Sequence, residues 1–234
     1  MKNRGEWMVV LLAVAGAGVD AMMILGFNVL TAAQTGNTIL FAVAIARGDF
    51  AGGLSAAISV AAFLGGTFYG ALIIGRKAPG PRVSGVCLAL GVELVLLLSL
   101  MLAWCFFGIP AEKAPANLLV GLAATAMGIQ SAVALSLHAR STTYITGILA
   151  GFTTGIAHRL ALRKEMPAAA PSPPGAPENP WINGLVWVVY AAGAVGAGCV
   201  FLRIGPAALL LPILAGGAAW VIEWLSAKRA ANSP

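Results

Sequence analysis

One short stretch of this chain gathers polar side chains that could bind a small solute. The segment GFNVLTAAQTGNTILFA, residues 26–42, carries amide and hydroxyl groups between two apolar runs, and Asp20 precedes it. An ionisable residue near the centre of a membrane helix costs about 2.5 to 3.5 kcal/mol on insertion scales and marks a functional site by default. The first candidate binding residues are therefore Asp20, Asn28, Thr31, Gln34, Thr35, Gly36, Asn37 and Thr38.

A second copy of this feature lies in the other half of the chain. The stretch GVDAMMILGFNVLTAAQTGNTILFA aligns with GIQSAVALSLHARSTTYITGILAGF further on. The alignment sets Asp20 against Gln130 and the TG pair at 35–36 against the TG pair at 146–147, with one residue inserted. Each copy follows an apolar run and precedes two more, so we interpret the chain as a duplicated unit. The second copy adds the candidates Gln130, Arg140, Thr142, Thr143, Tyr144, Thr146 and Gly147.

Two acids inside apolar runs are candidates for coupling an ion to this site. Asp20 could carry a proton or help to hold a cation; the alternative is a structural hydrogen bond to the polar segment. Glu93, in LGVELVLLL, either lies on an ion pathway or pairs with an internal base. Glu223 is expected to reach toward the membrane surface or to pair with Lys228, and it receives no role in the site.

The composition places these residues in a membrane protein. The 234 residues are 59% hydrophobic and 9% charged, whereas a typical soluble domain is about 25% charged. A bilayer-spanning helix needs roughly 20 mostly apolar residues. Runs of about this length recur at residues 7–25, 54–74, 83–107, 118–137, 181–202 and 207–225.

The first polar segment must interrupt a helix. If residues 7–47 formed one straight helix, it would be about 60 Å long at 1.5 Å per residue, which is about twice the thickness of the hydrocarbon core. Irregular backbone inside a membrane survives only when it is buried in protein or lines a wet cavity. We therefore expect a re-entrant segment that descends through residues 27–36 and returns as a half-helix over residues 37–46. The start of such a half-helix offers free N–H groups and a partial positive charge.

Positive charge indicates how the chain crosses the membrane, because cytoplasmic loops collect Lys and Arg. With six passes and the N-terminus inside, ten Lys and Arg residues are cytoplasmic and three are external. With eight passes the division becomes nine to four, since the basic cluster at residues 76–82 moves outside. The pattern favours six passes and leaves eight open. Three passes per unit is an odd number, so the second unit would enter the membrane from the opposite side.

The predicted fold is thus all-α: a polytopic membrane helix bundle with about six transmembrane helices, two broken or re-entrant polar segments and a 3+3 inverted repeat. It forms a single integral membrane domain over residues 1–234, with repeat one at 7–107 and repeat two at 117–225. A Pro- and Ala-rich linker at 164–180 joins two membrane segments on the cytoplasmic side, because its composition suits an extended, solvated chain.

Several other chemistries find no support in the sequence. The three cysteines lie singly in apolar runs without metal-ligand spacing, so no metal and no cofactor is expected. Basic residues fall at segment ends rather than in a stripe, which argues against nucleic acid. No Ser/His/Asp order, HExxH motif or phosphate loop is present, so an intramembrane enzyme is disfavoured, although Asp20, His138 and Tyr144 could still converge.

The two polar segments resemble those of the YoaK family of bacterial integral membrane proteins, which carry a domain of unknown function. The matching features are the acid-Ala pair at 20–21, the TGN at 35–37, the Gly-Ile-Gln at 128–130 and the TTYITG at 142–147. The resemblance spans nearly the whole chain outside the linker. It implies a location in the bacterial inner membrane and about six helices, and it implies no particular substrate.

From these residues we expect a small secondary transporter or permease that moves a small solute or ion through a site near the midplane. The alternatives are an intramembrane enzyme that uses the same pocket and a non-transporting membrane scaffold. The expected surroundings are the lipid bilayer of the inner (plasma) membrane, with both termini cytoplasmic. Small-residue runs such as YAAGAVGAG at 190–198 permit close helix contacts, either within one chain or in a homodimer.

Overall fold

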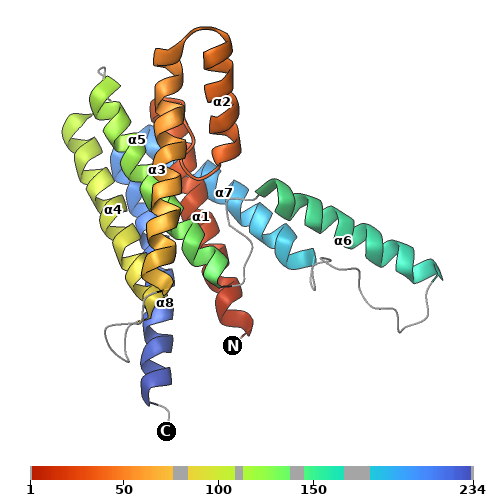
Figure 1. Cartoon of the computed structure of the whole chain (residues 1–234). Coiled ribbons are helices and arrows are strands. Elements are labelled where there is room, and N and C mark those ends of the chain that lie inside the picture. Colours follow the sequence, from red (N-terminus) through yellow and green to blue (C-terminus); the bar gives the residue numbers. More distant parts are fainter. Residues whose placement is uncertain (1, 76–83, 109–112, 138–144, 166–179, 233–234) are drawn as a thin grey trace.

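Eight α-helices and one 3-10 helix make up the described part of the chain, which in this computed structural model comprises residues 2–75, 84–108, 113–137, 145–165 and 180–232 (Figure 1). No strand occurs in these ranges, so the all-α prediction is confirmed. The elements are α1 (Lys2–Phe27), α2 (Gln34–Ala46), α3 (Phe50–Gly75), α4 (Gly85–Phe107), α5 (Lys113–Ser136), α6 (Ile145–Glu165), α7 (Pro180–Ile204), η1 (Gly205–Leu209) and α8 (Leu210–Asn232).

Five stretches are long and apolar enough to cross a membrane by length and composition: 4–27, 50–75, 85–107, 115–136 and 181–229. The last is 49 residues long because it continues from α7 through η1 into α8. At 25 and 23 residues, α7 and α8 are each long enough for a crossing. The 13 residues of α2 reach only about 20 Å. The prediction of a polytopic helix bundle is therefore confirmed, and the first polar segment is followed by a short helix.

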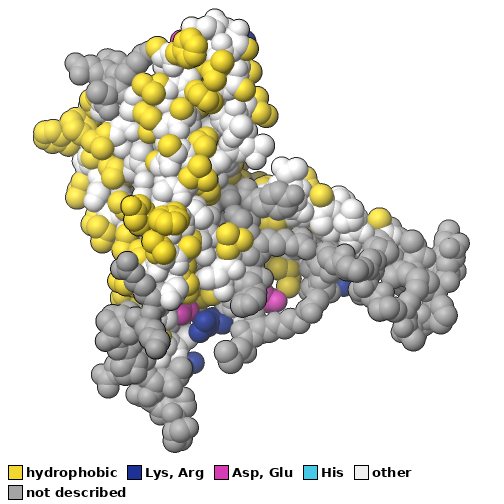
Figure 2. Space-filling view, viewed as in Figure 1, with side chains coloured by type: hydrophobic (Ala, Val, Ile, Leu, Met, Phe, Trp, Pro, Cys, Tyr) yellow, Lys and Arg dark blue, Asp and Glu magenta, His cyan; other side chains and the backbone are white. Residues whose placement is uncertain are grey.

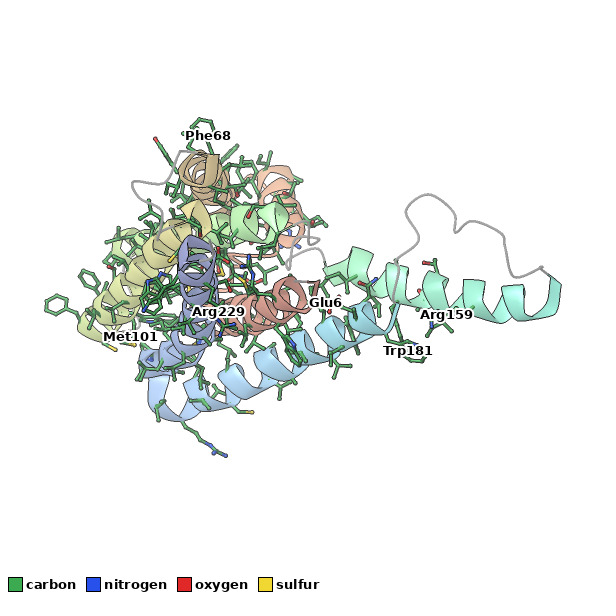
Figure 3. The ribbon with its side chains drawn as sticks, turned by 90° about the horizontal axis from the view of Figure 1, so that it is seen from below. Glu6, Phe68, Met101, Arg159, Trp181 and Arg229 are labelled. Atoms are coloured by element: carbon green, nitrogen blue, oxygen red, sulfur yellow. The ribbon has the colours of Figure 1, made fainter. Side chains whose placement is uncertain are left out.

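The outer surface of the bundle is apolar over most of its height. Phe68 on α3 is 61% exposed and projects away from the other helices (Figure 3). Phe106 on α4 is 84% exposed. In Figure 2, hydrophobic side chains cover the bundle, and charged side chains lie toward its two ends. Apolar patches of this extent mark a surface that contacts lipid or protein rather than water.

Two helices, α1 and α5, occupy the interior. In their most apolar windows, 67% of α1 and 72% of α5 are buried, against 17% of α3. The two helices run antiparallel, because the Gln130 side chain donates to the Leu12 carbonyl oxygen at 2.8 Å and Gly5 lies beside the Leu137 carbonyl. The remaining long helices are arranged around this central pair.

The outer helix α3 packs closely on α5 and runs parallel to it. Near their starts, the Ser55 hydroxyl donates to Asn117 Oδ1 at 2.7 Å. Further along, the Gly66 backbone is so close to α5 that a Cβ atom there would lie 2.3 Å from the Thr125 carbonyl oxygen. Only glycine allows the two backbones to approach to this distance.

The helix α7 has the matching relation to α1. Gly193 lies against Val14 and Ala197 lies against Gly18, so residue numbers rise in the same direction along both helices. A Cβ atom at Gly18 would lie 3.2 Å from the Ala197 side chain, so this interface is also built on small residues. The pair α1 and α7 therefore resembles the pair α5 and α3 in direction and in the use of glycine.

The helix α8 returns antiparallel to α1. Pro212, near the start of α8, lies against Gly18, whereas Glu223 pairs with Arg4 at the beginning of α1. The hydroxyl of Ser84, which caps the N-terminus of α4, also donates to Glu223. The start of α1, the start of α4 and the last part of α8 therefore meet at one end of the bundle.

Candidate functional site

The carboxyl group of Asp20 holds the connection between α1 and α2. Its Oδ1 accepts hydrogen bonds from the backbone N–H groups of Thr31 and Ala32, both at 2.7 Å, and from the Thr31 hydroxyl at 3.2 Å. Its Oδ2 accepts from the Ala33 N–H at 3.0 Å. Asp20 is 3% exposed. Both oxygens act as acceptors, so three consecutive backbone donors of a non-helical segment are satisfied by one side chain.

These contacts require the chain to turn back along α1. Asp20 precedes the end of α1 at Phe27 by seven residues, which corresponds to about 10 Å along the axis. Asn28 begins the return with a φ of 60°, and its N–H donates to the Ile24 carbonyl oxygen at 3.0 Å. Asparagine tolerates this left-handed conformation better than most residues. The segment 28–33 therefore descends beside α1, as predicted, and α2 begins at Gln34, three residues before the predicted start.

A second set of hydrogen bonds fixes the start of α2 against α3. The Asn37 amide nitrogen donates to the Leu30 carbonyl oxygen at 2.6 Å, to Gln34 Oε1 at 2.8 Å and to Ser59 Oγ at 3.0 Å. Asn37 Oδ1 accepts from the Leu30 N–H at 3.1 Å. The Ser59 hydroxyl donates to the Leu30 carbonyl oxygen at 2.7 Å, and the Gln34 amide donates to the Thr31 carbonyl oxygen at 2.8 Å. Together with the Asp20 contacts, these hydrogen bonds give many of the polar groups of the segment a partner within the protein.

Ser59 is a site residue that sequence reasoning missed. It is a fully buried polar residue in the middle of α3, between apolar neighbours in AAISVAA. Single hydroxyl residues are common in membrane helices, where they usually bond back to their own helix, as Thr67 does to the Phe63 carbonyl oxygen. The signal that could have identified Ser59 is that α3 follows α2 after a short turn. Two helices joined in this way pack against each other, so a polar residue on α3 can reach the start of α2.

The first-copy candidates thus divide into two groups. Asp20, Thr31, Gln34 and Asn37 are brought together by the structure. Asn28, Thr35 and Thr38 are exposed, and the Thr38 hydroxyl bonds back within α2 to the Gln34 carbonyl oxygen at 3.0 Å. Gly36 packs against the Leu30 side chain.

The second copy begins its helix at the same point as the first. Thr35 and Gly36 are the second and third residues of α2, and Thr146 and Gly147 are the second and third residues of α6. In both cases the helix then packs on the next long helix: α2 lies along α3, and the Phe152 ring of α6 meets the Trp181 ring of α7 edge-on. Four predicted site residues lie outside the described residues: Arg140, Thr142, Thr143 and Tyr144.

The two helix starts lie at different levels of α1. The start of α2 is held at Asp20, whereas Ile148 of α6 packs in a buried cluster with Val9 and Ala13 of α1. Seven residues separate Ala13 from Asp20, or about 10 Å along the helix. The intervening sequence, VAGAGV, consists of small and β-branched residues. The two segments therefore flank one stretch of α1 instead of meeting end to end at a single point.

Gln130 and Glu93 lie in the interior but away from the polar segments. Gln130 is fully buried and donates to the Leu12 carbonyl oxygen, so it bonds to α1 and not to the α5–α6 connection. Glu93 on α4 is also fully buried, and a Cβ atom at Gly216 of α8 would lie 3.7 Å from its Oε1. The two acids named as coupling candidates are thus in separate parts of the bundle.

The prediction for Glu223 is wrong in its partner. Glu223 Oε2 lies 3.2 Å from Arg4 Nη2, and Glu223 Oε1 accepts from the Ser84 hydroxyl at 2.7 Å. Lys228 instead lies over the Trp224 ring, with its nitrogen 5.4 Å from the ring centre. The sequence suggested a partner within the same helix, because Lys228 follows Glu223 on α8. The helix arrangement instead brings Arg4, at the start of α1, to this end of the bundle.

The described residues contain no group of three His, Cys, Asp or Glu side chains that could hold a metal ion. A family model with the description "protein of unknown function (DUF1275)" matches residues 8–222. This range includes both polar segments and all but the outermost parts of α1 and α8. No curated protein and no solved structure matches the chain.

Proposed function

The chain belongs to the DUF1275 family of proteins of unknown function, and from the geometry described above we propose that it is a small secondary transporter. In this proposal the protein moves a small solute or ion across the bacterial inner membrane. The site lies near the midplane, along α1 between the starts of α2 and α6. No cofactor takes part.

The observation that carries this proposal is the matched arrangement of the two halves. If the first half is matched to the second, α1 corresponds to α5, α2 to α6, α3 to α7 and α4 to α8. The parallel packing of α3 on α5 then corresponds to the parallel packing of α7 on α1. The antiparallel packing of α2 on α3 corresponds to that of α6 on α7. Because α1 and α5 run in opposite directions, the correspondence is that of a 3+3 inverted repeat, with repeat one at 7–107 and repeat two at 117–225.

Inverted repeats with interrupted helices are the usual architecture of secondary transporters. The two halves of such a protein can exchange conformations, so one site opens alternately to the two sides of the membrane. The start of a helix carries a partial positive charge that favours a polar or anionic solute. Here Thr35 and Thr146 are exposed hydroxyl residues in the first turns of α2 and α6.

The charge distribution supports an orientation with both termini in the cytoplasm. The Arg4–Glu223 pair and Ser84 place the beginning of α1, the beginning of α4 and the last part of α8 at one end. Lys228 and Arg229 follow on α8, and the basic stretch 76–82 precedes α4 in the sequence. Cytoplasmic ends collect Lys and Arg. The YoaK resemblance of the TGN and TTYITG motifs supports the inner membrane as the location.

Solute binding tests the proposal. Purified protein would be screened by thermal unfolding against small polar solutes and ions, because a ligand that binds the folded state raises the unfolding temperature. We expect a stabilising solute whose effect is lost in the double variant Thr35→Ala/Thr146→Ala. The matched control is Thr153→Ala, another exposed threonine on α6, whose hydroxyl bonds back to its own helix.

A stabilising solute would then be tested for uptake into vesicles that contain the protein. Uptake by the wild type and by Thr153→Ala, but not by the double variant, supports transport. Binding without uptake would instead favour a non-transporting scaffold, a second candidate that is suggested by the hydrogen-bonded filling of the first polar segment.

Cysteine labelling tests the inverted repeat separately. In a variant in which Cys87, Cys105 and Cys199 are replaced by alanine, single cysteines would be introduced by Asp49→Cys and Arg82→Cys. Intact cells would then be treated with a membrane-impermeant thiol reagent. We expect reaction at position 49 and protection at position 82; external reaction at 82 would overturn the inverted repeat.

A further inference from the structure

The carboxyl group of Glu93 is buried without a hydrogen-bond partner. The side chain is fully buried, and neither of its oxygens has a partner among the residues that the structure describes. On α8, a Cβ atom at Gly216 would lie 3.7 Å from Glu93 Oε1, so the absence of a side chain there leaves room for the carboxyl group. A buried polar group without a partner is rare in folded proteins and calls for a functional explanation.

Glu93 lies at a boundary between two apolar layers. One buried cluster includes Leu90 of α4 together with residues of α1, α5 and α8, and the other includes Leu97 of α4 with residues of the same helices or of η1. Glu93 falls between these two leucines in sequence. At the same boundary the neighbouring helices carry Gly16, Gln130 and Gly216 in place of large apolar residues.

Near the boundary between the two clusters in sequence lie Gly16 on α1, Glu93 on α4, Gln130 on α5 and Gly216 on α8, and we call this set the polar layer. The Gln130 amide donates a hydrogen bond to the Leu12 carbonyl oxygen of α1 and lies beside Gly16. A Cβ atom at Gly16 would be 3.2 Å from the Gln130 amide nitrogen. The layer lies deep inside the spanning helices. A groove of about 470 Å³ with an apolar lining runs along the outer side of the same α4–α8 contact, between Leu94 and Gly217.

No basic group pairs with Glu93 among the described side chains of the elements packed around it. On α1, Arg4 pairs with Glu223 near the end of the bundle, and Asp20 accepts hydrogen bonds from the backbone of residues 31–33. Among the side chains that the structure describes, α3, α5 and η1 carry no acid, Lys, Arg or His. On α8, Glu223 is paired with Arg4, and Lys228 and Arg229 follow in the last turns. The described part of the bundle therefore favours the ion-pathway interpretation of Glu93 over pairing with an internal base.

We propose that Glu93 binds the proton that drives transport, an inference that rests on the proposed transporter function. A lone carboxylate in an apolar layer is strongly disfavoured, so the closed layer holds the neutral acid. When the layer opens to water on one side, the acid releases a proton to that water and becomes a carboxylate, and reprotonation from the other side completes the cycle. A metal cation would need several oxygen ligands, whereas the neighbours of Glu93 here are a glycine and apolar side chains.

Infrared spectroscopy of the protein in lipid vesicles tests the proton site directly. We expect the wild type to show the carbonyl stretch of a protonated, buried carboxyl group, and Glu93→Gln to lack it. Glu223→Gln is the matched control, because it removes the acid that has a base and a hydroxyl as partners. A band that persists unchanged in Glu93→Gln would overturn the proposal.

Proton flux tests the coupling role. Vesicles loaded with a pH-sensitive dye would receive an imposed pH gradient, and acidification of the lumen would be followed. We expect flux through the wild type and Glu223→Gln, loss of flux in Glu93→Gln, and partial recovery in Glu93→Asp, which keeps a carboxyl group and guards against a variant that fails to fold. Equal flux through Glu93→Gln and the wild type would overturn the coupling role.

The two experiments separate the two proposals. If the infrared band is lost in Glu93→Gln while the wild type carries neither protons nor solutes, Glu93 is a proton site and the transporter proposal fails. If a solute crosses through Glu93→Gln with the same dependence on the pH gradient as through the wild type, the transporter proposal stands and Glu93 is not its coupling residue.

Discussion

Two buried acids in this protein are held in opposite ways. Asp20 accepts four hydrogen bonds, three of them from consecutive backbone N–H groups, and it fixes the shape of the α1–α2 connection. Glu93 is also buried and has no hydrogen-bond partner among the described residues. Burial alone therefore does not assign a role to an acid in a membrane helix. The hydrogen-bond donors around each acid differ: the satisfied acid positions the backbone, and the unsatisfied acid is the one for which we propose proton exchange.

The largest expected effect is the loss of the Asp20 carboxyl group. Asp20→Ala leaves three buried backbone N–H groups without a partner, so we expect the free energy of unfolding to fall by about 3 kcal/mol or more. Asp20→Asn keeps one acceptor oxygen and should cost less. Denaturant unfolding in detergent, followed by Trp fluorescence, would measure both. If Asp20→Ala unfolded like the wild type, the contrast with Glu93 would be broken.

A smaller loss is expected at Asn37. Asn37→Ala removes both hydrogen bonds to the Leu30 backbone and leaves Ser59 with fewer partners, so we expect a destabilisation of about 2 kcal/mol. Thr38→Ala, one position further on α2, is the control, because its exposed hydroxyl bonds only within the helix. Hydrogen exchange at residues 28–37 should increase in Asn37→Ala and stay unchanged in Thr38→Ala.

Replacing Glu93 should stabilise the protein, whereas replacing Asp20 or Asn37 should destabilise it. Glu93→Leu replaces an unpartnered carboxyl group by an apolar side chain of similar size, so we expect the free energy of unfolding to rise by about 1 kcal/mol. The same unfolding measurement applies, with Leu90→Ala as a destabilising control in the neighbouring apolar layer. A clear loss of stability in Glu93→Leu would show that the carboxyl group has partners that the described residues do not include.

The smallest change in the free energy of unfolding is expected when Glu223, the third buried acid, loses its partner Arg4. Arg4 is 36% exposed, so solvent screens its pair with Glu223, and we expect Arg4→Gln to cost less than about 1 kcal/mol. Added salt should narrow the difference between Arg4→Gln and the wild type, because exposed ion pairs are screened. An effect as large as that of Asp20→Ala would place Glu223 with Asp20 among the acids that shape the fold.

Much of the architecture was predictable because bilayer thickness limits helix length. The apolar runs, the excess length of residues 7–47 and the repeated TG pair predicted the long helices, the break before α2 and the start of α6. The exact position of the break was not predictable from propensity, since α2 begins with Gln34 and lacks a side-chain cap at Ala33. Asp20 stabilises the residues that lead into that start, which lie eleven to thirteen positions after it.

The site was predicted less completely than the fold. The sequence identified Asp20, Thr31, Gln34 and Asn37, which the structure brings together. It could not identify Ser59, because a partner from α3 depends on how helices rotate against each other. Nor could it distinguish Asp20 from Glu93, since both are single acids in apolar runs and differ only in the donors that surround them.

The short separation between Asp20 and its partners also bears on how the protein enters the membrane. A helix with a central acid is a poor insertion unit on its own. The donors at residues 31–33 emerge from the ribosome directly after α1, and closing so short a loop costs little entropy. We therefore expect α1, the returning segment and α2 to leave the insertion machinery as one unit, with the acid already covered before α3 arrives.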